Sequence, residues 1–263
     1  MSASQDAASK VPEVTLVFWI IKICATTLGE TGGDALSMSM NLGYLLSTAI
    51  FAVVFAVAVA VQIRAARFHA VLYWVTIVAT TTVGTTLADF ATRNLFCPGA
   101  GADEHTCGIG YPGGATLLFA LLMASLYAWH RALGSVSIAS VRTPQAETFY
   151  WVTIMFSQTL GTALGDWTAD SAGLGYLGAA AIFIGLLAAT AALYAWTDLS
   201  HTALFWAAFI LTRPLGATLG DFLDKPLDEG GLALSRYAAT AVLVGLIAVL
   251  VTAFRQRPAR MAH

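Results

Sequence analysis

Eight apolar stretches, each about the length of a membrane-spanning helix, fill most of this 263-residue chain. A helix of about 20 predominantly apolar residues crosses the hydrocarbon core of a bilayer. The chain is 58% hydrophobic and 11% charged, whereas a water-soluble protein has roughly 25% charged residues. The sequence therefore predicts an all-α integral membrane protein with about eight transmembrane helices. The predicted spans are 14–34, 43–63, 69–90, 113–130, 147–168, 174–196, 202–223 and 233–254.

One motif recurs in the four odd-numbered spans. It consists of an aromatic residue followed by Trp, a Gly ten residues after the Trp, and an Asp five residues after the Gly. Because the copies align without gaps, they indicate internal duplication. We predict four two-helix parallel repeats that form a duplicated four-helix half. The predicted parts are half one (14–130), a cytoplasmic linker (131–146), half two (147–254) and short cytoplasmic tails (1–13 and 255–263).

The glycines of the motif are predicted to bring helices close together. Small residues at four-residue spacing let membrane helices approach each other, and this is their commonest role. These glycines are Gly29, Gly84, Gly161 and Gly216.

A polar stripe accompanies the glycines, because residues four apart share one helix face. We expect the stripes to face one another or partner spans, since lipid does not favour a polar face. In chain order the stripes are Lys22, Thr26, Glu30, Asp34; Thr81, Thr85, Asp89; Gln158, Thr162, Asp166; and Arg213, Ala217, Asp221.

The motif aspartates, Asp34, Asp89, Asp166 and Asp221, allow two interpretations. Their position predicts a place near the outer end of the hydrocarbon, where an acid could simply cap a loop. An acid at a helix C-terminus opposes the helix dipole, however, which favours a local partner such as a cation, an Arg or unpaired N–H groups. The sequence leaves the two open.

Three further charged residues of the odd spans are candidates for an ion pathway. Buried bases such as Lys22 and Arg213 are costly in a membrane and are usually paired or line a pathway. Glu30 lies one turn before Asp34, and two close carboxylates can bind a cation. The first span is therefore the strongest site candidate.

Basic residues near the spans predict that both termini are cytoplasmic, because cytoplasmic loops hold the excess of Lys and Arg. Loops after odd spans contain Arg93, Lys225 and Arg236. Trp and Tyr residues near span ends are interpreted as an interfacial belt. The tails and the loops after even spans contain Lys10, Arg64, Arg67, Arg131, Arg142, Arg255, Arg257 and Arg260.

Cys97 and Cys107 share the long loop on the predicted outer side. An oxidising compartment favours a disulfide between them. A metal site is the alternative, because acids and His105 lie beside Cys107, but the spacing matches no standard zinc pattern. The identity of any metal stays unknown.

The four copies TTLGETGGD, TTVGTTLADF, QTLGTALGDW and RPLGATLGDF resemble a bacterial family of uncharacterised multi-pass proteins labelled membrane-anchored. The resemblance implies a bacterial inner-membrane protein and supplies no activity. The segment from Glu30 to Asp34 also resembles, more loosely, the Glu-x-Gly-Asp motif of cation exporters. It has one inserted residue, and the other copies lack the Glu.

The sequence thus predicts a small inner-membrane secondary transporter or exporter of a cation, a divalent metal being one candidate. The alternative is a non-transporting membrane scaffold or sensor. No enzyme and no cofactor is predicted, because the sequence has no nucleophile–base pair or haem-type His pair. The expected partners are the lipid bilayer and a small ion or molecule. Nucleic acid is not expected, since Lys and Arg total 13 and form no basic domain. The oligomeric state is not predicted.

Overall fold

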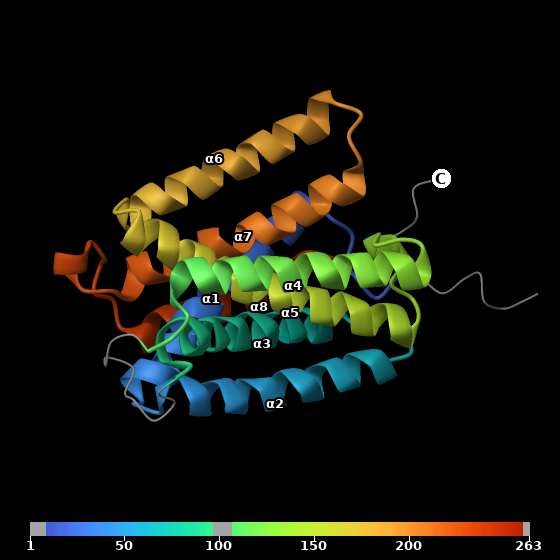
Figure 1. Cartoon of the computed structure of the whole chain (residues 1–263). Coiled ribbons are helices and arrows are strands. Elements are labelled where there is room, and N and C mark those ends of the chain that lie inside the picture. The colour runs from blue at the N-terminus through green and yellow to red at the C-terminus, as the bar shows by residue number, and fades with distance from the viewer. Residues whose placement is uncertain (1–8, 97–106, 260–263) are drawn as a thin grey trace, which may run out of the picture.

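The computed structural model describes residues 9–96 and 107–259, and in this part of the chain eight α-helices run roughly side by side (Figure 1). The prediction of an all-helical chain is confirmed for the described residues. The helices are α1 (Leu16–Asp34), α2 (Gly43–Arg64), α3 (Ala70–Asp89), α4 (Gly110–Leu133), α5 (Pro144–Asp166), α6 (Gly175–Trp196), α7 (His201–Asp224) and α8 (Arg236–Ala253).

Six of the eight described helices are long and apolar enough to cross a membrane, and α1 and α5 are not. Helix α1 carries Lys22, Glu30 and Asp34, and all three are buried. Helix α5 likewise buries Gln158 and several hydroxyl side chains. These two helices were expected to be as apolar as the others. They differ because they contact neighbouring helices along most of their length, and their polar groups meet protein.

The local sequence explains where three motif helices begin and how three of them end. Thr15, Thr143 and Ser200 cap α1, α5 and α7 by accepting hydrogen bonds from backbone N–H groups of the first turn, as N-cap residues do. After the motif aspartates of α1, α3 and α5 the chain continues as π-helical turns, η1 (Ala35–Ser39), η2 (Phe90–Asn94) and η4 (Trp167–Ser171). These aspartates therefore do not lie at a free helix end.

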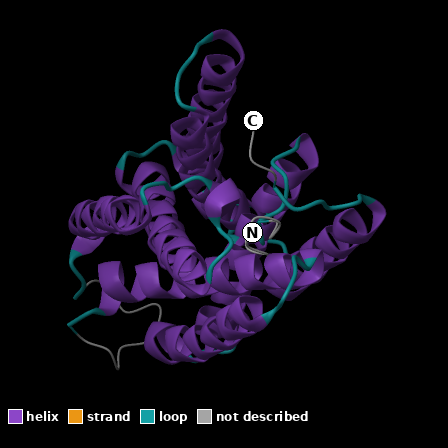
Figure 2. Cartoon of the chain, turned by 90° about the vertical axis from the view of Figure 1, so that its right-hand side faces the viewer, coloured by secondary structure: helices purple, strands orange, loops and turns teal. Residues whose placement is uncertain are grey.

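The four motif helices form a ring, and the other four lie around it. Helix α1 packs against α3 and α7, and α5 also packs against α3 and α7, which closes the ring. Each outer helix packs on a motif helix of the next repeat: α2 on α3, α4 on α5, α6 on α7 and α8 on α1. Figure 2 shows the bundle at right angles to Figure 1.

The polarity of this bundle is reversed relative to a water-soluble protein. The outer helices expose large apolar side chains, for example Val57 at 58%, Leu117 at 52% and Val242 at 69%. The ring buries polar ones, and Thr85 and Gln158 are 0% exposed. Contiguous exposed apolar surface of this kind marks contact with lipid or with another protein.

The motif glycines bring neighbouring ring helices into contact in one cyclic pattern. Each lies against the residue three positions before the motif Gly of the next ring helix, where a Cβ would be too close to be accommodated without a shift. The close packing of the ring therefore requires a residue without a side chain at these four positions. The pairs are Gly29 with Thr81, Gly84 with Gln158, Gly161 with Arg213, and Gly216 with Thr26.

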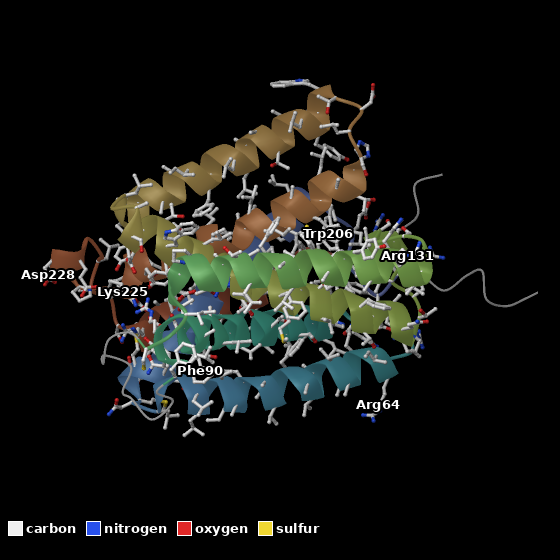
Figure 3. The ribbon with its side chains drawn as sticks, viewed as in Figure 1. Arg64, Phe90, Arg131, Trp206, Lys225 and Asp228 are labelled. Carbon is white, nitrogen blue, oxygen red and sulfur yellow. The ribbon has the colours of Figure 1, made fainter. Side chains whose placement is uncertain are left out.

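Aromatic side chains fill one end of the ring, which we call the aromatic end. The Tyr73 and Tyr150 hydroxyls are 2.6 Å apart and hydrogen-bonded. Trp74, Trp151 and Trp206 are at most 4% exposed. Trp74 packs against the Tyr73 ring, and Trp151 and Trp206 pack against the Tyr150 ring. The interpretation of these tryptophans as an interfacial belt is wrong, because their side chains point into the bundle. Figure 3 shows Trp206 and Arg131 toward this end, and Lys225 and Asp228 at the other.

Three segments far apart in the sequence cover the aromatic end. Backbone hydrogen bonds join Lys10 N to Val141 O at 3.1 Å and Ala259 N to Val11 O at 2.8 Å. The Lys10 ammonium lies 2.7 Å from the carboxylate of Glu147, which is buried. The described ends of the chain and the segment between the halves are therefore tied together here.

We predict that Gly29→Ala destabilises the fold by about 1–3 kcal/mol, the usual cost of overpacking. The added Cβ would overlap the Thr81 side chain. The control is Gly185→Ala on α6, where a Cβ meets no atom within 4 Å, so the gain in helix propensity should leave stability unchanged or higher. Thermal unfolding in detergent measures both, and equal stability of the two variants would contradict the close-contact role.

Candidate functional site

The polar stripes of the four ring helices face the inside of the bundle and divide it into layers, one helical turn apart. All of their residues are buried. From the aromatic end these are the lysine layer (Lys22, Ile77, Ile154, Phe209), the arginine layer (Thr26, Thr81, Gln158, Arg213), the glutamate layer (Glu30, Thr85, Thr162, Ala217) and the aspartate layer (Asp34, Asp89, Asp166, Asp221).

The glutamate layer surrounds one guanidinium group. Nη2 of Arg213 donates to Glu30 Oε2 at 2.9 Å, to the Thr162 hydroxyl at 2.6 Å, and to the Thr85 hydroxyl. Nη1 donates to the Thr26 carbonyl at 3.3 Å. The bound groups come from α1, α3 and α5, and the arginine comes from α7. Four helices therefore meet at one buried cation.

The aspartate layer is held by two basic residues that each bridge two acids. Arg93 lies 3.3 Å from Asp89 and 3.5 Å from Asp166. Lys225 lies 2.9 Å from Asp34 and 3.3 Å from Asp221. Both bridges join a helix of the first half of the chain to a helix of the second half.

Two pairs of aspartates in this layer have no base between them among the residues that the structure describes. Asp34 and Asp89 offer carboxylate oxygens within 4.8 Å of each other and of Glu30. Asp166 and Asp221 form a second such group, again with Glu30. Carboxylates this close repel one another unless they share a proton or hold a cation. Such oxygen sets are the ligands that hard cations prefer.

A third group of acids extends the site toward the loops. Asp224 completes a cluster with Asp34 and Asp221, and Arg236 lies 3.2 Å from Asp224 and 3.8 Å from Asp34. Burial lowers the pKa of Lys225, but the surrounding carboxylates, Asp34 first, raise it well above its ordinary value. Lys225 therefore stays positively charged.

Acids outnumber bases among the described residues of this cluster. The carboxylates are Glu30, Asp34, Asp89, Asp166, Asp221 and Asp224, and the bases are Arg93, Arg213, Lys225 and Arg236. With every group ionised, two negative charges remain unbalanced. One divalent cation, two monovalent cations or two protons would neutralise them.

Compared with known protein families, the chain matches a repeat of unknown function, DUF347, four times, over residues 17–68, 72–134, 149–200 and 204–257. The chain belongs to the DUF347 family. Each match covers most of one motif helix and all of the helix that follows it, so the resemblance to an uncharacterised family with a fourfold repeat is confirmed. No match was found among curated proteins or among solved structures.

Within the DUF347 repeats, two predicted site residues differ in their surroundings. Arg213 has Glu30 as its partner in another helix. Lys22 has no hydrogen-bond partner among the described residues, and its ammonium group lies 4.2 Å from the centre of the Phe209 ring. Such a cation–π contact satisfies part of the charge, so Lys22 is the less well neutralised of the two bases.

The structure adds two site residues that the sequence alone places in loops. Arg93 and Lys225 each follow a motif Asp by four residues, a spacing at which side chains meet on a helix. The corresponding residues of the first and third repeats are Met38 and Asp170. The i, i+4 spacing was therefore the available signal, and it marks the second and fourth repeats only.

One of the two cysteines of the predicted disulfide lies among the described residues. Cys107 is disulfide-bonded, and Cys97 lies outside the described residues, as do Asp103, Glu104 and His105. The pairing of Cys97 with Cys107 stays a prediction. Cys24, in α1, is a free thiol.

We predict that Lys225→Met destabilises the protein by about 3–5 kcal/mol, the usual cost of removing one partner from a buried ion pair. Asp34 and Asp221 would lose the charge between them. Lys225→Arg keeps that charge and is the matched control. Thermal unfolding measures the effect, and adding Asp221→Asn to Lys225→Met should restore part of the loss. A double variant no more stable than Lys225→Met would contradict the bridge.

Proposed function

We propose that this protein is a small secondary transporter or exporter of the bacterial inner membrane, which moves a cation along the axis of its four motif helices. The observation that carries the proposal is the excess of carboxylates over bases in the buried cluster formed by the glutamate and aspartate layers. Residual negative charge in a low-dielectric interior requires a cation or protons. Ionisable groups inside a membrane protein commonly mark an ion pathway.

Insertion into a membrane is supported by the apolar outer surface. The four outer helices α2, α4, α6 and α8 are each long and apolar enough to span a bilayer. Little of each is buried in the bundle, so most of their apolar surface is open to contact with lipid. The more polar α1 and α5 lie in the ring. Eight spans as four parallel two-helix repeats are consistent with this arrangement, because charged groups face protein and apolar side chains face lipid.

A cytoplasmic location of the aromatic end is supported by the charges at the two ends. Arg64 and Arg131 lie toward the aromatic end (Figure 3), at the C-termini of α2 and α4. At the other end Arg93, Lys225 and Arg236 are engaged by buried carboxylates. Free positive charge is thus concentrated at the aromatic end, as the positive-inside rule requires of a cytoplasmic face.

The way in which the halves are joined supports alternating access. The contacts Glu30–Arg213, Asp89–Arg93–Asp166 and Asp34–Lys225–Asp221 all cross between the halves. The two aspartate pairs without a base, in contrast, each lie within one half. A cation that binds such a pair changes the charge facing the opposite half, and this couples occupancy to the interface.

The test is cation binding and uptake by the purified protein in liposomes, with Mn²⁺, Zn²⁺, Mg²⁺ and Na⁺ as probes. We expect at least one of these ions to stabilise the protein and to be taken up. Replacing the pair Asp34 and Asp89 with Asn should weaken that binding by about tenfold or more, because it removes two charged ligands. The matched control is Asp228→Asn, an exposed acid at the same end, which should leave binding and uptake unchanged.

A non-transporting scaffold is the competing function, and the closed ring of Gly contacts favours it. If the protein is a scaffold, we expect that no probe ion binds to it or crosses the liposome membrane. Asn variants of the motif aspartates should then change the expression level only. Growth of a deletion strain across metals, salts and pH values gives the cellular readout. An unchanged growth profile together with no uptake would exclude the transporter in favour of the scaffold.

A further inference from the structure

The groups that bind the Arg213 guanidinium form a set of oxygen ligands suited to a free cation. They are the Glu30 carboxylate, the Thr85 and Thr162 hydroxyls and the Thr26 carbonyl. We call this set the oxygen cage. One anionic and three neutral oxygens resemble the ligands that hard cations take from proteins. In this structure the oxygen cage holds the guanidinium of Arg213, a cation that belongs to the chain itself.

The surrounding sequence is arranged so that this one arginine reaches the cage. A Cβ on Gly161 would overlap the Arg213 side chain, so the Gly leaves a passage for it. Ala217, one turn further along α7, is the smallest residue of the glutamate layer. The equivalents of Arg213 in the other repeats are Thr26, Thr81 and Gln158, which carry no charge.

The guanidinium is held firmly at one edge and weakly at the other. Its Nη atoms make four hydrogen bonds, whereas Nε is buried and has no hydrogen-bond partner in the described part of the chain. A buried donor without a partner costs free energy. This cost reduces the net stabilisation of the bound arginine relative to a fully satisfied one.

We infer that Arg213 is a tethered cation that occupies a cation-binding cage on the axis of the ring, and that it closes the axis while it is bound. The inference rests on the proposed pathway between the motif helices. A cation arriving from the aspartate layer meets the cage next, because the glutamate layer is one helical turn deeper. It can occupy the cage only by displacing Arg213. The ligand class is therefore a small cation that competes with guanidinium for Glu30.

The decisive variant is Arg213→Ala in the full-length protein, reconstituted in liposomes. The substitution removes an ethylguanidinium fragment, which serves as the probe. We expect Arg213→Ala to leak Na⁺ about tenfold or more above the unaltered protein, since hydrogen bonds to a charged group that hold the axis closed are lost. Ethylguanidinium should block this leak saturably and raise the melting temperature of the variant. It should do neither to the unaltered protein, whose cage is filled.

Two further variants separate the cage from a simple loss of stability. Arg213→Ala combined with Glu30→Gln should lose the saturable block by ethylguanidinium, because the anionic ligand is gone. Leu122→Ala removes a fully buried side chain of α4, outside the ring, and leaves the cage filled, so it should destabilise the fold without a leak. A leak of the same size in Leu122→Ala would overturn the inference.

If Arg213→Ala does not fold, a second variant, Thr162→Val, tests the same inference. Thr162→Val removes one oxygen of the cage while keeping a similar shape, and it should raise the Na⁺ leak because Arg213 is held less firmly. If folded Arg213→Ala, or Thr162→Val in its place, does not leak, the inference is wrong even where the unaltered protein transports cations. If Arg213→Ala leaks and the unaltered protein transports nothing, the cage stands and the proposed transport function fails.

Discussion

The ion pair between Glu30 and Arg213 is the interaction on which the rest of the interior depends. Both side chains are buried, at 3% and 0% exposure, and in a medium of low dielectric each charge is stabilised by the other. The pair comes from opposite halves of the chain, so the halves must assemble before either charge is compensated. The close Gly contacts of the ring then follow as a requirement, because a wider ring would separate the two groups.

The ring has fourfold packing and twofold charge, and this difference gives the interior its asymmetry. Every motif Gly makes the same kind of contact with its neighbour, which preserves the fourfold repeat. The bridging bases Arg93 and Lys225 occur in the second and fourth repeats alone. Within each half the aspartates consequently face each other without a base between them. Duplication of a half that carried one such base produces this pattern directly. The two halves differ from each other in turn, because Lys22 and Arg213 occupy different repeat positions.

The sequence was sufficient for the helices and for the inward stripe, but it did not determine which helices are neighbours. The stripe could be predicted because Lys22, Glu30 and Asp34 share one helical face whatever the tertiary structure. The contacts of Arg93 with Asp166 and of Lys225 with Asp34 join residues far apart in the chain, and they depend on ring closure. For the same reason the sequence alone predicts an interfacial position for Trp74 and Trp151. Their depth along the helix was predictable, and the direction that they face was set by neighbours.

The order of charges along the axis argues for closure at the aromatic end. From the loops inward, a cation meets four aspartates, then Glu30 with its bound Arg213, then Lys22. Attraction therefore changes to repulsion within about three helical turns, a distance of roughly 16 Å. Beyond Lys22 the Tyr73–Tyr150 hydrogen bond and the surrounding aromatic rings fill the bundle. Passage toward that end requires both the basic layers and the aromatic packing to rearrange. Because Tyr73 and Tyr150 belong to different halves, as Glu30 and Arg213 do, one relative movement of the halves would release both barriers.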